Sequence, residues 1–348
     1  MLRSAVFLAF ALLPVAVLEA QSSPIPVADY TVSHTFRLGG NAPWDALSLD
    51  RSGGRLFVSR TDHVDVIDTA TGKQTATIGR TAGVHGVAFA PPVNRGFTSN
   101  GLSNSVSVFE LDSLRVVQEV TLPGQHPDAI LYEPQHNLVI TANRDSSDLT
   151  VIDAGALRVV STIPLPGHPE SLISDGAGHV YVNINEAPGK LVLVDAKTLT
   201  VKRKWPLKDC ANPTGIAIDT AEHRVFSVCA NQSMAVTDSV TGKTVARIVI
   251  GRGADSVGYD PDFQMLFTSN GIDGNLTVIH QDSPDDYRVL ATVTTQVSAR
   301  TLVLDPGSHR IYLAAARFGP PPTQGPEQPA PHANLIPDTF VILVAQPK

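Results

Sequence analysis

The chain has 348 residues, of which 43% are hydrophobic, 6% aromatic and 17% charged, and its net charge is −7. This composition supports one large globular domain or two ordinary ones and excludes an intrinsically disordered chain. The acidic balance argues against a protein that binds nucleic acid through phosphate contacts, and two cysteines are too few for a disulfide-rich scaffold or a multi-cysteine metal cluster.

The N-terminus is typical of an export signal. Arg3 precedes an apolar run, residues 5–18, that is too short to span a bilayer comfortably, and Ala20 offers a cleavage site. An uncleaved anchor is the alternative. We therefore expect a signal peptide over residues 1–20 and a mature chain, residues 21–348, without a transmembrane segment, in the periplasm or the medium.

Seven short segments with alternating apolar residues recur along the rest of the chain. Their first residues are spaced by 42 or 43 positions, except the last, which follows after 64. The segments are residues 64–67, 106–109, 149–152, 191–194, 234–237, 276–279 and 340–343. Such a regular spacing indicates a repeat protein rather than a two-sheet sandwich.

Each repeat contains four predicted strands. Residues 215–219, 55–59 and 244–250 exemplify the first, second and fourth strands, and the seven segments are the third strands. Turn sequences such as residues 68–73 join third to fourth strands. Repeats of about 42 residues with four strands each predict an all-β protein, a seven-bladed β-propeller with four-stranded antiparallel blades.

Both ends of the repeat array are incomplete. Residues 30–38 are a predicted fourth strand with no first three before it, and the last repeat has only three strands. We expect the N-terminal strand to complete the last blade, which leaves no open edge. A proline-rich stretch, residues 319–337, cannot form a ladder and is predicted as a loop inserted in the last blade, either a lid, a partner-binding segment or a plain surface loop. The mature chain is thus predicted to be a single domain.

Several repeats resemble a known sequence motif. Residues 55–59 with 64–73, Ser99 and Asn100 with 106–108, and residues 141–143 with 149–153 resemble the YVTN repeat, which is WD40-like. The mature chain is similar to bacterial, exported YncE-like propellers. The resemblance implies a seven-bladed fold and no particular reaction, since most members have none assigned. One type of member is associated with DNA binding, from which this acidic chain departs.

Equivalent positions in the seven blades converge around the channel of a propeller. The residue two before the first apolar residue of each innermost strand is polar in every blade. These residues are Asp45, His85, Asp128, Glu170, Thr214, Asp255 and Arg300. Four carboxylates facing one guanidinium predict a cation site or a polar ligand site, unless the mouth of the channel is merely filled with water.

Two further histidines, His126 and His168, precede innermost strands of adjacent blades. Together with His85 they could place three imidazoles near one face, where Asp128 and Glu170 would add carboxylates. Imidazole suits transition metals and carboxylates suit harder divalent ions. A divalent metal ion is therefore a possible cofactor, although the sequence has no HExxH-type spacing to support it.

The second strands end in amides or arginines that we expect to open onto the same face. These residues are Arg60, Asn100, Asn143, Asn183, Asn231, Asn270 and Arg317. We take Asn100 and Asn270 as candidate ligand-binding residues, although asparagine at such positions often serves its own turn. Trp44 is either a stacking platform at the mouth or part of the packing between blades.

Cys210 and Cys229 lie within one repeat, the first before an innermost strand and the second at the end of the next strand. A hairpin brings these two positions to the same face, and export favours oxidation, so we predict a disulfide. A pair of free thiols that binds a soft metal is the alternative.

Three functions follow from these features. The first is an exported, monomeric scaffold that binds a small polar ligand or a protein at the channel mouth without catalysis. The second is a metal-assisted, lactonase-like hydrolase or lyase, in which His85 or His126 is the base and Asp128, Glu170 and Asp255 hold the ion. The third, DNA binding, rests only on the resemblance, and we expect no nucleic-acid partner.

Overall fold

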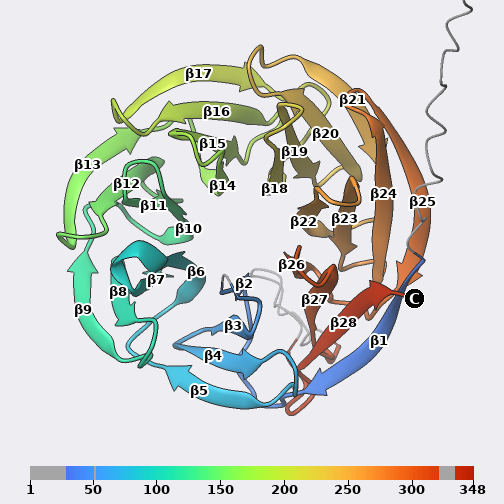
Figure 1. Cartoon of the computed structure of the whole chain (residues 1–348), viewed down its shortest axis with the longest axis horizontal. Helices are drawn as coiled ribbons and strands as arrows, with labels where there is room; N and C mark the ends of the chain where they lie inside the picture. The colour runs from blue at the N-terminus through green and yellow to red at the C-terminus, as the bar shows by residue number, and fades with distance from the viewer. Residues whose placement is uncertain (1–28, 51, 321–333) are drawn as a thin grey trace, which may run out of the picture.

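In the computed structural model, residues 29–50, 52–320 and 334–348 are described. The described chain forms seven four-stranded antiparallel sheets arranged as blades around a central channel (Figure 1). This confirms the predicted seven-bladed propeller. The predicted signal peptide, residues 1–20, lies outside the described residues, as does most of the proline-rich loop. Across the described residues, no helix has the length and apolar character needed to cross a membrane.

The first six blades run outward from the channel in chain order, and the last blade has β1 as its outermost strand. The innermost strands are β2 (Leu47–Leu49), β6 (Val84–Ala90), β10 (Pro127–Glu133), β14 (Pro169–Ser174), β18 (Pro213–Asp219), β22 (Ala254–Asp260) and β26 (Thr301–Asp305). The second strands are β3 (Arg55–Arg60), β7 (Arg95–Asn100), β11 (Leu138–Asn143), β15 (His179–Ile184), β19 (Arg224–Cys229), β23 (Met265–Asn270) and β27 (Arg310–Ala315).

The third strands coincide with the seven recurring segments of the sequence. They are β4 (His63–Asp68), β8 (Ser105–Glu110), β12 (Asp148–Asp153), β16 (Lys190–Asp195), β20 (Ser233–Asp238), β24 (Asn275–Ser283) and β28 (Val341–Pro347). The outermost strands are β5 (Gln74–Ile78), β9 (Val116–Thr121), β13 (Arg158–Pro164), β17 (Thr200–Pro206), β21 (Thr244–Val249), β25 (Asp286–Thr294) and β1 (Tyr30–Arg37). One 3-10 turn, η1 (Pro91–Val93), joins β6 to β7.

Apolar packing between neighbouring blades forms the core. Second and third strands such as β3 and β12 are buried on both faces, whereas outermost strands such as β13 alternate between exposed and covered residues. This alternation arises because successive side chains of a strand point to opposite faces of the sheet, and only one face of an outermost strand is covered. In one cluster, Leu56 of the first blade packs with Tyr312 and Phe340 of the last. The repeats therefore stabilise one another rather than folding as separate units.

The predicted turns between third and fourth strands form through a side-chain cap. Asp68 Oδ1 accepts hydrogen bonds from the backbone N–H and the hydroxyl of Thr71, each at 2.7 Å. Gly72 follows with φ +68°, a conformation that strongly favours glycine. Asp238 and Thr241 repeat this arrangement in the fifth blade. The Asp-x-x-Thr-Gly pattern therefore favours a tight turn between the third and fourth strands of a blade.

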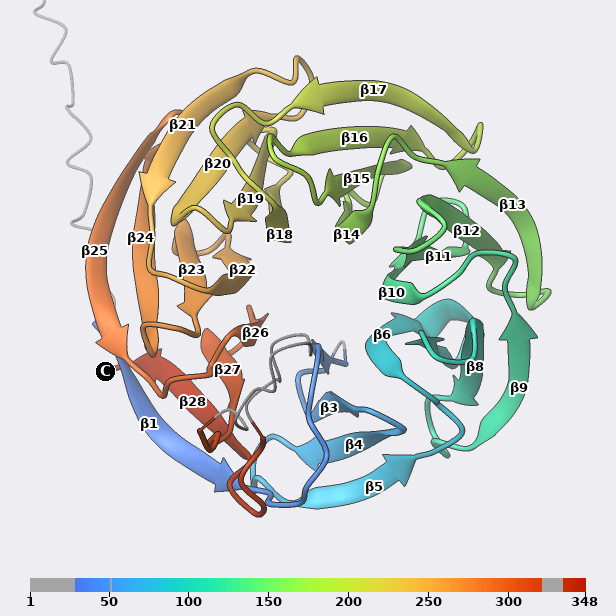
Figure 2. The same ribbon diagram turned by 180° about the vertical axis from the view of Figure 1, so that it is seen from behind.

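The N-terminal strand closes the ring, as predicted. β1 pairs antiparallel with β28, from Tyr30 opposite Pro347 to Arg37 opposite Val341. Figures 1 and 2 show β1 as the outer strand of the last blade, beside the end of the chain. Within the same blade, Phe318 pairs with Leu335, so the proline-rich insertion leaves and returns between β27 and β28. β28 therefore has a partner strand on both sides, and the last blade has four strands like the other six.

Candidate functional site: the channel mouth

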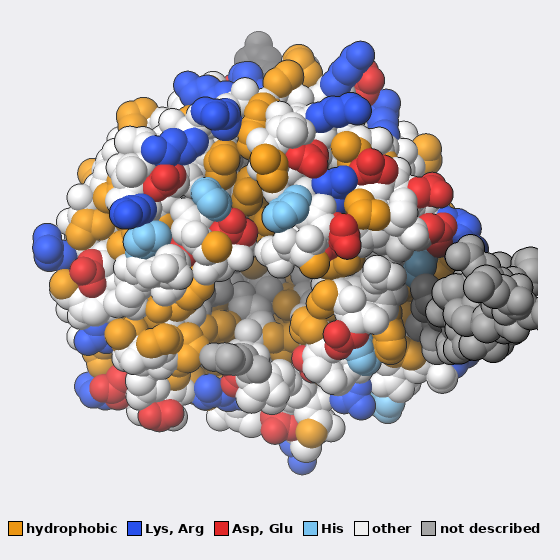
Figure 3. Space-filling model, turned by 45° about the horizontal axis from the view of Figure 1, so that its top comes forward, with side chains coloured by type: hydrophobic (Ala, Val, Ile, Leu, Met, Phe, Trp, Pro, Cys, Tyr) orange, Lys and Arg blue, Asp and Glu red, His pale blue; other side chains and the backbone are white. Residues whose placement is uncertain are grey.

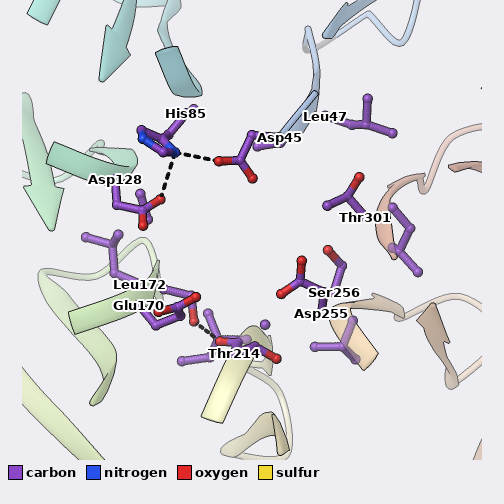
Figure 4. A pocket seen from close by; sticks show the side chains of 18 residues that line it. Asp45, Leu47, His85, Asp128, Glu170, Leu172, Thr214, Asp255, Ser256 and Thr301 are labelled. Carbon is purple, nitrogen blue, oxygen red and sulfur yellow. Dashed lines mark hydrogen bonds and ion pairs between the residues drawn. The ribbon is translucent and has the colours of Figure 1, made fainter. Parts of the chain in front are cut away.

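The channel opens into a cavity of about 310 Å³ at the face where the innermost strands begin. Six of the seven predicted ring residues line it: Asp45, His85, Asp128, Glu170, Thr214 and Asp255. Figure 4 shows their side chains pointing into one common space. The cavity lining therefore contains four carboxylates and one imidazole, on different blades.

The seventh ring residue, Arg300, does not line this cavity. Its side chain is exposed, and its Nη1 donates a hydrogen bond to Asp255 Oδ2 at 2.7 Å. The backbone of the last blade places Thr301 in the cavity wall instead. Arg300 thus partly neutralises one carboxylate from outside, and the described residues that line the cavity include no arginine.

The residues that follow the ring positions are small. Ala46, Gly86, Ala129, Ser171 and Gly215 occupy these positions in the first five blades. A Cβ on Gly215 would lie 2.7 Å from the backbone oxygen of Asp255, so the innermost strands of the fifth and sixth blades approach too closely for a side chain at Gly215. Leucine, isoleucine and valine come next along the strands, which makes the deeper part of the cavity apolar.

Serine hydroxyls from one blade hold the ring backbone of the next. Ser99 donates to the carbonyl of Asp128, Ser171 to that of Thr214, and Ser269 to that of Arg300. The Thr214 hydroxyl in turn donates to the carbonyl of Ala254 at 3.1 Å. These bonds between blades fix the direction in which the ring side chains point, which is the preorganisation a binding site needs.

Asp45, His85 and Asp128 form the tightest group at the mouth. His85 Nδ1 lies 2.5 Å from Asp45 Oδ2 and 3.6 Å from Asp128 Oδ1. One ligand atom from each residue lies within 4.8 Å of the others, a spacing that could hold a metal ion. His126 lies beside His85, with 5.1 Å between ring centroids, but neither it nor Glu170 belongs to this group.

The other predicted candidates lie elsewhere. His168 donates from Nδ1 to the carbonyl of Arg144 at 2.8 Å, away from the group around His85. Asn100 and Asn270 are fully buried behind the cavity wall, where they bond to Ser107 and Thr277 of the neighbouring strands. Because their amides are satisfied inside the blades, we correct the prediction and leave Asn100 and Asn270 out of the candidate site.

Trp44 is a packing residue, one of its two predicted alternatives. It is only 6% exposed and packs against Phe340, with ring centroids 5.2 Å apart. Its Nε1 donates to the Thr301 hydroxyl at 3.1 Å, which ties the first blade to the last beside the cavity.

The predicted disulfide between Cys210 and Cys229 is present. Both cysteines are buried in an apolar cluster between the fourth and fifth blades, with Leu191 and Leu207. The bond joins the segment entering β18 to the end of β19. Since Thr214 lies near the start of β18, the disulfide also anchors the strand that contributes this ring residue.

The crowding of carboxylates changes their acidity. Burial raises the pKa of Asp128 to about 7, with the charges of Asp45 and Glu170 adding to the effect, although His85 and Arg144 oppose it. Burial also raises the pKa of Asp255 to about 6 in spite of Arg300. Burial would lower the pKa of His85, but its hydrogen bond to Asp45 and the nearby negative charges outweigh burial and raise it. Carboxylates outnumber the cationic groups at the mouth, so the site favours the entry of positive charge, whether as a proton or as a ligand.

We expect Asp128→Asn to stabilise the fold at pH 8 by roughly 1–3 kcal/mol. The folded carboxyl has a pKa near 7 and the unfolded one near 3.8, so wild-type stability falls as the pH rises from about 4 to 7. Asparagine has no proton to lose. Thermal unfolding in a buffer with chelator should show a higher Tm for the variant at pH 8 and equal values at pH 4. A lower Tm at pH 8 would contradict this account.

Comparison with known proteins shows the fold alone. No protein-family model matches the sequence, and no curated protein matches it either. Among solved structures, the chain is similar to hydrazine synthase of Kuenenia stuttgartiensis, with a TM-score of 0.70 at 18% identity over 79% of this chain and 94% of that one. U3-55K (TM-score 0.73, 11% identity, 91% and 98% covered) and the WD40 repeats of RRP9 (0.73, 10%, 92% and 98%) are similar as well. These identities are too low to transfer a function.

Proposed function

We propose that this protein is an exported, YncE-like propeller that binds a positively charged ligand at its channel mouth, without catalysis. The observation that supports this most directly is the lining of the cavity, where the described residues include the carboxylates of Asp45, Asp128, Glu170 and Asp255 and the imidazole of His85. A cation that enters relieves the repulsion among these groups, whereas an anion or a phosphate increases it.

The protonated amine of a lysine side chain suits this cavity as a probe. It is compact and donates three hydrogen bonds, so it can contact carboxylates from several blades at once. A nucleic acid would instead need positively charged side chains at the mouth. Figure 3 shows Lys and Arg side chains toward the outer edge, over β17, where Lys202, Arg203 and Lys204 are exposed. They lie on the outermost strand rather than at the mouth.

Fluorescence anisotropy with the labelled peptide Gly-Gly-Lys-Gly tests the proposal. We expect binding that is lost with the Gln counterpart, that weakens with salt, and that weakens about tenfold in Asp255→Asn or Glu170→Gln. The affinity should rise on the order of 10- to 100-fold from pH 5 to pH 8, because Asp255 and Asp128 become negatively charged over this range.

Asp286→Asn is the matched control, since it removes one exposed carboxylate from the outermost strand β25 and should leave the affinity unchanged. Equal binding of the Lys and Gln peptides, or equal losses in the ring variants and this control, would refute an acidic ligand site at the mouth.

A metal-assisted hydrolase remains the second candidate because Asp45, His85 and Asp128 could jointly coordinate a divalent ion. His85→Gln separates the two functions in the same experiment. It removes a metal ligand and a competing positive charge, so Mn²⁺ binding measured by calorimetry should be lost while lysine-peptide binding is kept or tightened. Tight Mn²⁺ binding to the wild type that His85→Gln abolishes would favour the hydrolase.

A further inference from the structure

A second hollow lies directly beside the channel mouth, between the sixth and seventh blades. This apolar groove of about 510 Å³ is lined mainly by Trp44, Ile272, Val297 and Phe318. Asp255 and Arg300 also line the groove, and Asp255 lines the channel cavity as well. One carboxylate therefore forms the boundary shared by a charged cavity and an apolar groove.

The groove is held open by packing and hydrogen bonds. Phe318 stands against the buried Trp44, with ring centroids 6.0 Å apart. Ser298 bonds to two blades at once, since its backbone N–H donates to Gly271 of the sixth blade and its hydroxyl donates to Ala316 of the seventh. The loop that contains Val297 is thus anchored on both sides, and a ligand would not have to form the groove.

Its apolar side chains face solvent to an unusual degree. Ile272 is 61% exposed, Val297 is 66% exposed and Phe318 is 43% exposed. Clustered apolar side chains that protrude in this way are a feature of surfaces that meet another protein chain, whereas small molecules are mostly enclosed by concave walls. A peptide would cover these side chains and remove them from water.

We propose that the ligand of the channel mouth is a peptide segment in which a lysine or arginine adjoins a bulky aliphatic or aromatic residue. The cationic side chain enters the acidic cavity, and the apolar side chain lies in the groove on the other side of Asp255. This inference rests on the proposed function. It extends the preference for a positive charge to a preference for two adjoining residues, one cationic and one apolar. Charge complementarity selects the first part of the peptide and burial of apolar surface selects the second.

Three labelled peptides test the inference: Gly-Leu-Lys-Gly, Gly-Gly-Lys-Gly and Gly-Leu-Gln-Gly. Measured by fluorescence anisotropy, the first should bind at least about tenfold more tightly than either of the others, because one buried leucine side chain is sufficient for such a gain. Ile272→Ser should reduce the affinity for the Leu-Lys peptide to that for the Gly-Lys peptide, and leave the affinity for the Gly-Lys peptide unchanged. Val297→Ser, also at an exposed position, should do the same.

Leu102→Ser is the matched control. Leu102 follows Ser-Asn-Gly in the turn between β7 and β8, as Ile272 does between β23 and β24, and it is exposed but does not line the groove. Its substitution should leave all affinities unchanged. Equal affinities for the Leu-Lys and Gly-Lys peptides would overturn the groove inference and keep the proposed function. Binding of Leu-Gln as tight as that of Leu-Lys, or no binding of either Lys peptide, would overturn both.

Discussion

A chain that begins at Leu38 instead of Asp29 is expected to lose its cooperative thermal unfolding transition, or to have a Tm lower by about 10 °C or more. The shortened chain lacks β1, which is the outer strand of the last blade. It also lacks Tyr30, a buried residue that packs on Phe267 with ring centroids 4.6 Å apart. Without β1, the backbone of β28 becomes an open edge that can pair with another molecule.

Differential scanning calorimetry should therefore show a broad or early transition, and size-exclusion chromatography should show a shift toward larger aggregates. The control is a chain that begins at Asp29, which keeps the whole of β1 and should keep the Tm of the longer chain. A synthetic peptide of residues 29–38 added to the shortened chain should restore part of the lost stability, since it can occupy the empty position. A shortened chain with an unchanged Tm and an unchanged elution volume would show that the N-terminal strand does not close the ring.

Removal of the disulfide through Cys210→Ala with Cys229→Ala is expected to lower the free energy of unfolding by about 3 kcal/mol. The bond links residues separated by 19 positions, and this loop restricts the unfolded chain. Alanine avoids the buried hydroxyl that serine would place among Tyr181, Leu191 and Val225. Urea unfolding, followed by tryptophan fluorescence, measures the difference.

Reduction provides an independent check on the same bond. A reducing agent should lower the unfolding midpoint of the wild type and leave that of the double alanine variant unchanged. The same bond also anchors the start of β18, near Thr214 of the channel mouth. Variant and wild type with the same unfolding midpoint under oxidising conditions would contradict a stabilising disulfide.

The mouth of the channel shows where reasoning from sequence succeeds and where it stops. Equivalent positions in a repeat converge by symmetry, so a fixed offset from each innermost strand finds Asp45, Asp128 and Asp255 without coordinates. The same rule fails at Arg300, whose long side chain reaches outward to pair with Asp255. An offset fixes the position of a backbone atom, but contacts decide where a flexible side chain goes.

Asn100 and Asn270 also show that a position in the repeat does not decide what a side chain contacts. As predicted, they end second strands, yet each bonds to the third strand of its own blade. Their sequence signal was the hydroxyl residue seven positions later, Ser107 or Thr277, which points to a bond inside the blade. The apolar groove had a weaker signal, because Ile272 and Val297 look like ordinary loop residues until Phe318 and Trp44 are placed beside them.

The sequence by itself determined the number of blades, the closure by the N-terminal strand, the tight turns and the disulfide, because each depends on periodicity or on residues close along the chain. Only the tertiary structure decided which polar residues share one cavity and which bond inside a blade. It also decided that an apolar groove borders Asp255. These features arise between residues far apart in the chain, where packing of side chains from different blades sets distances, burial and acidity.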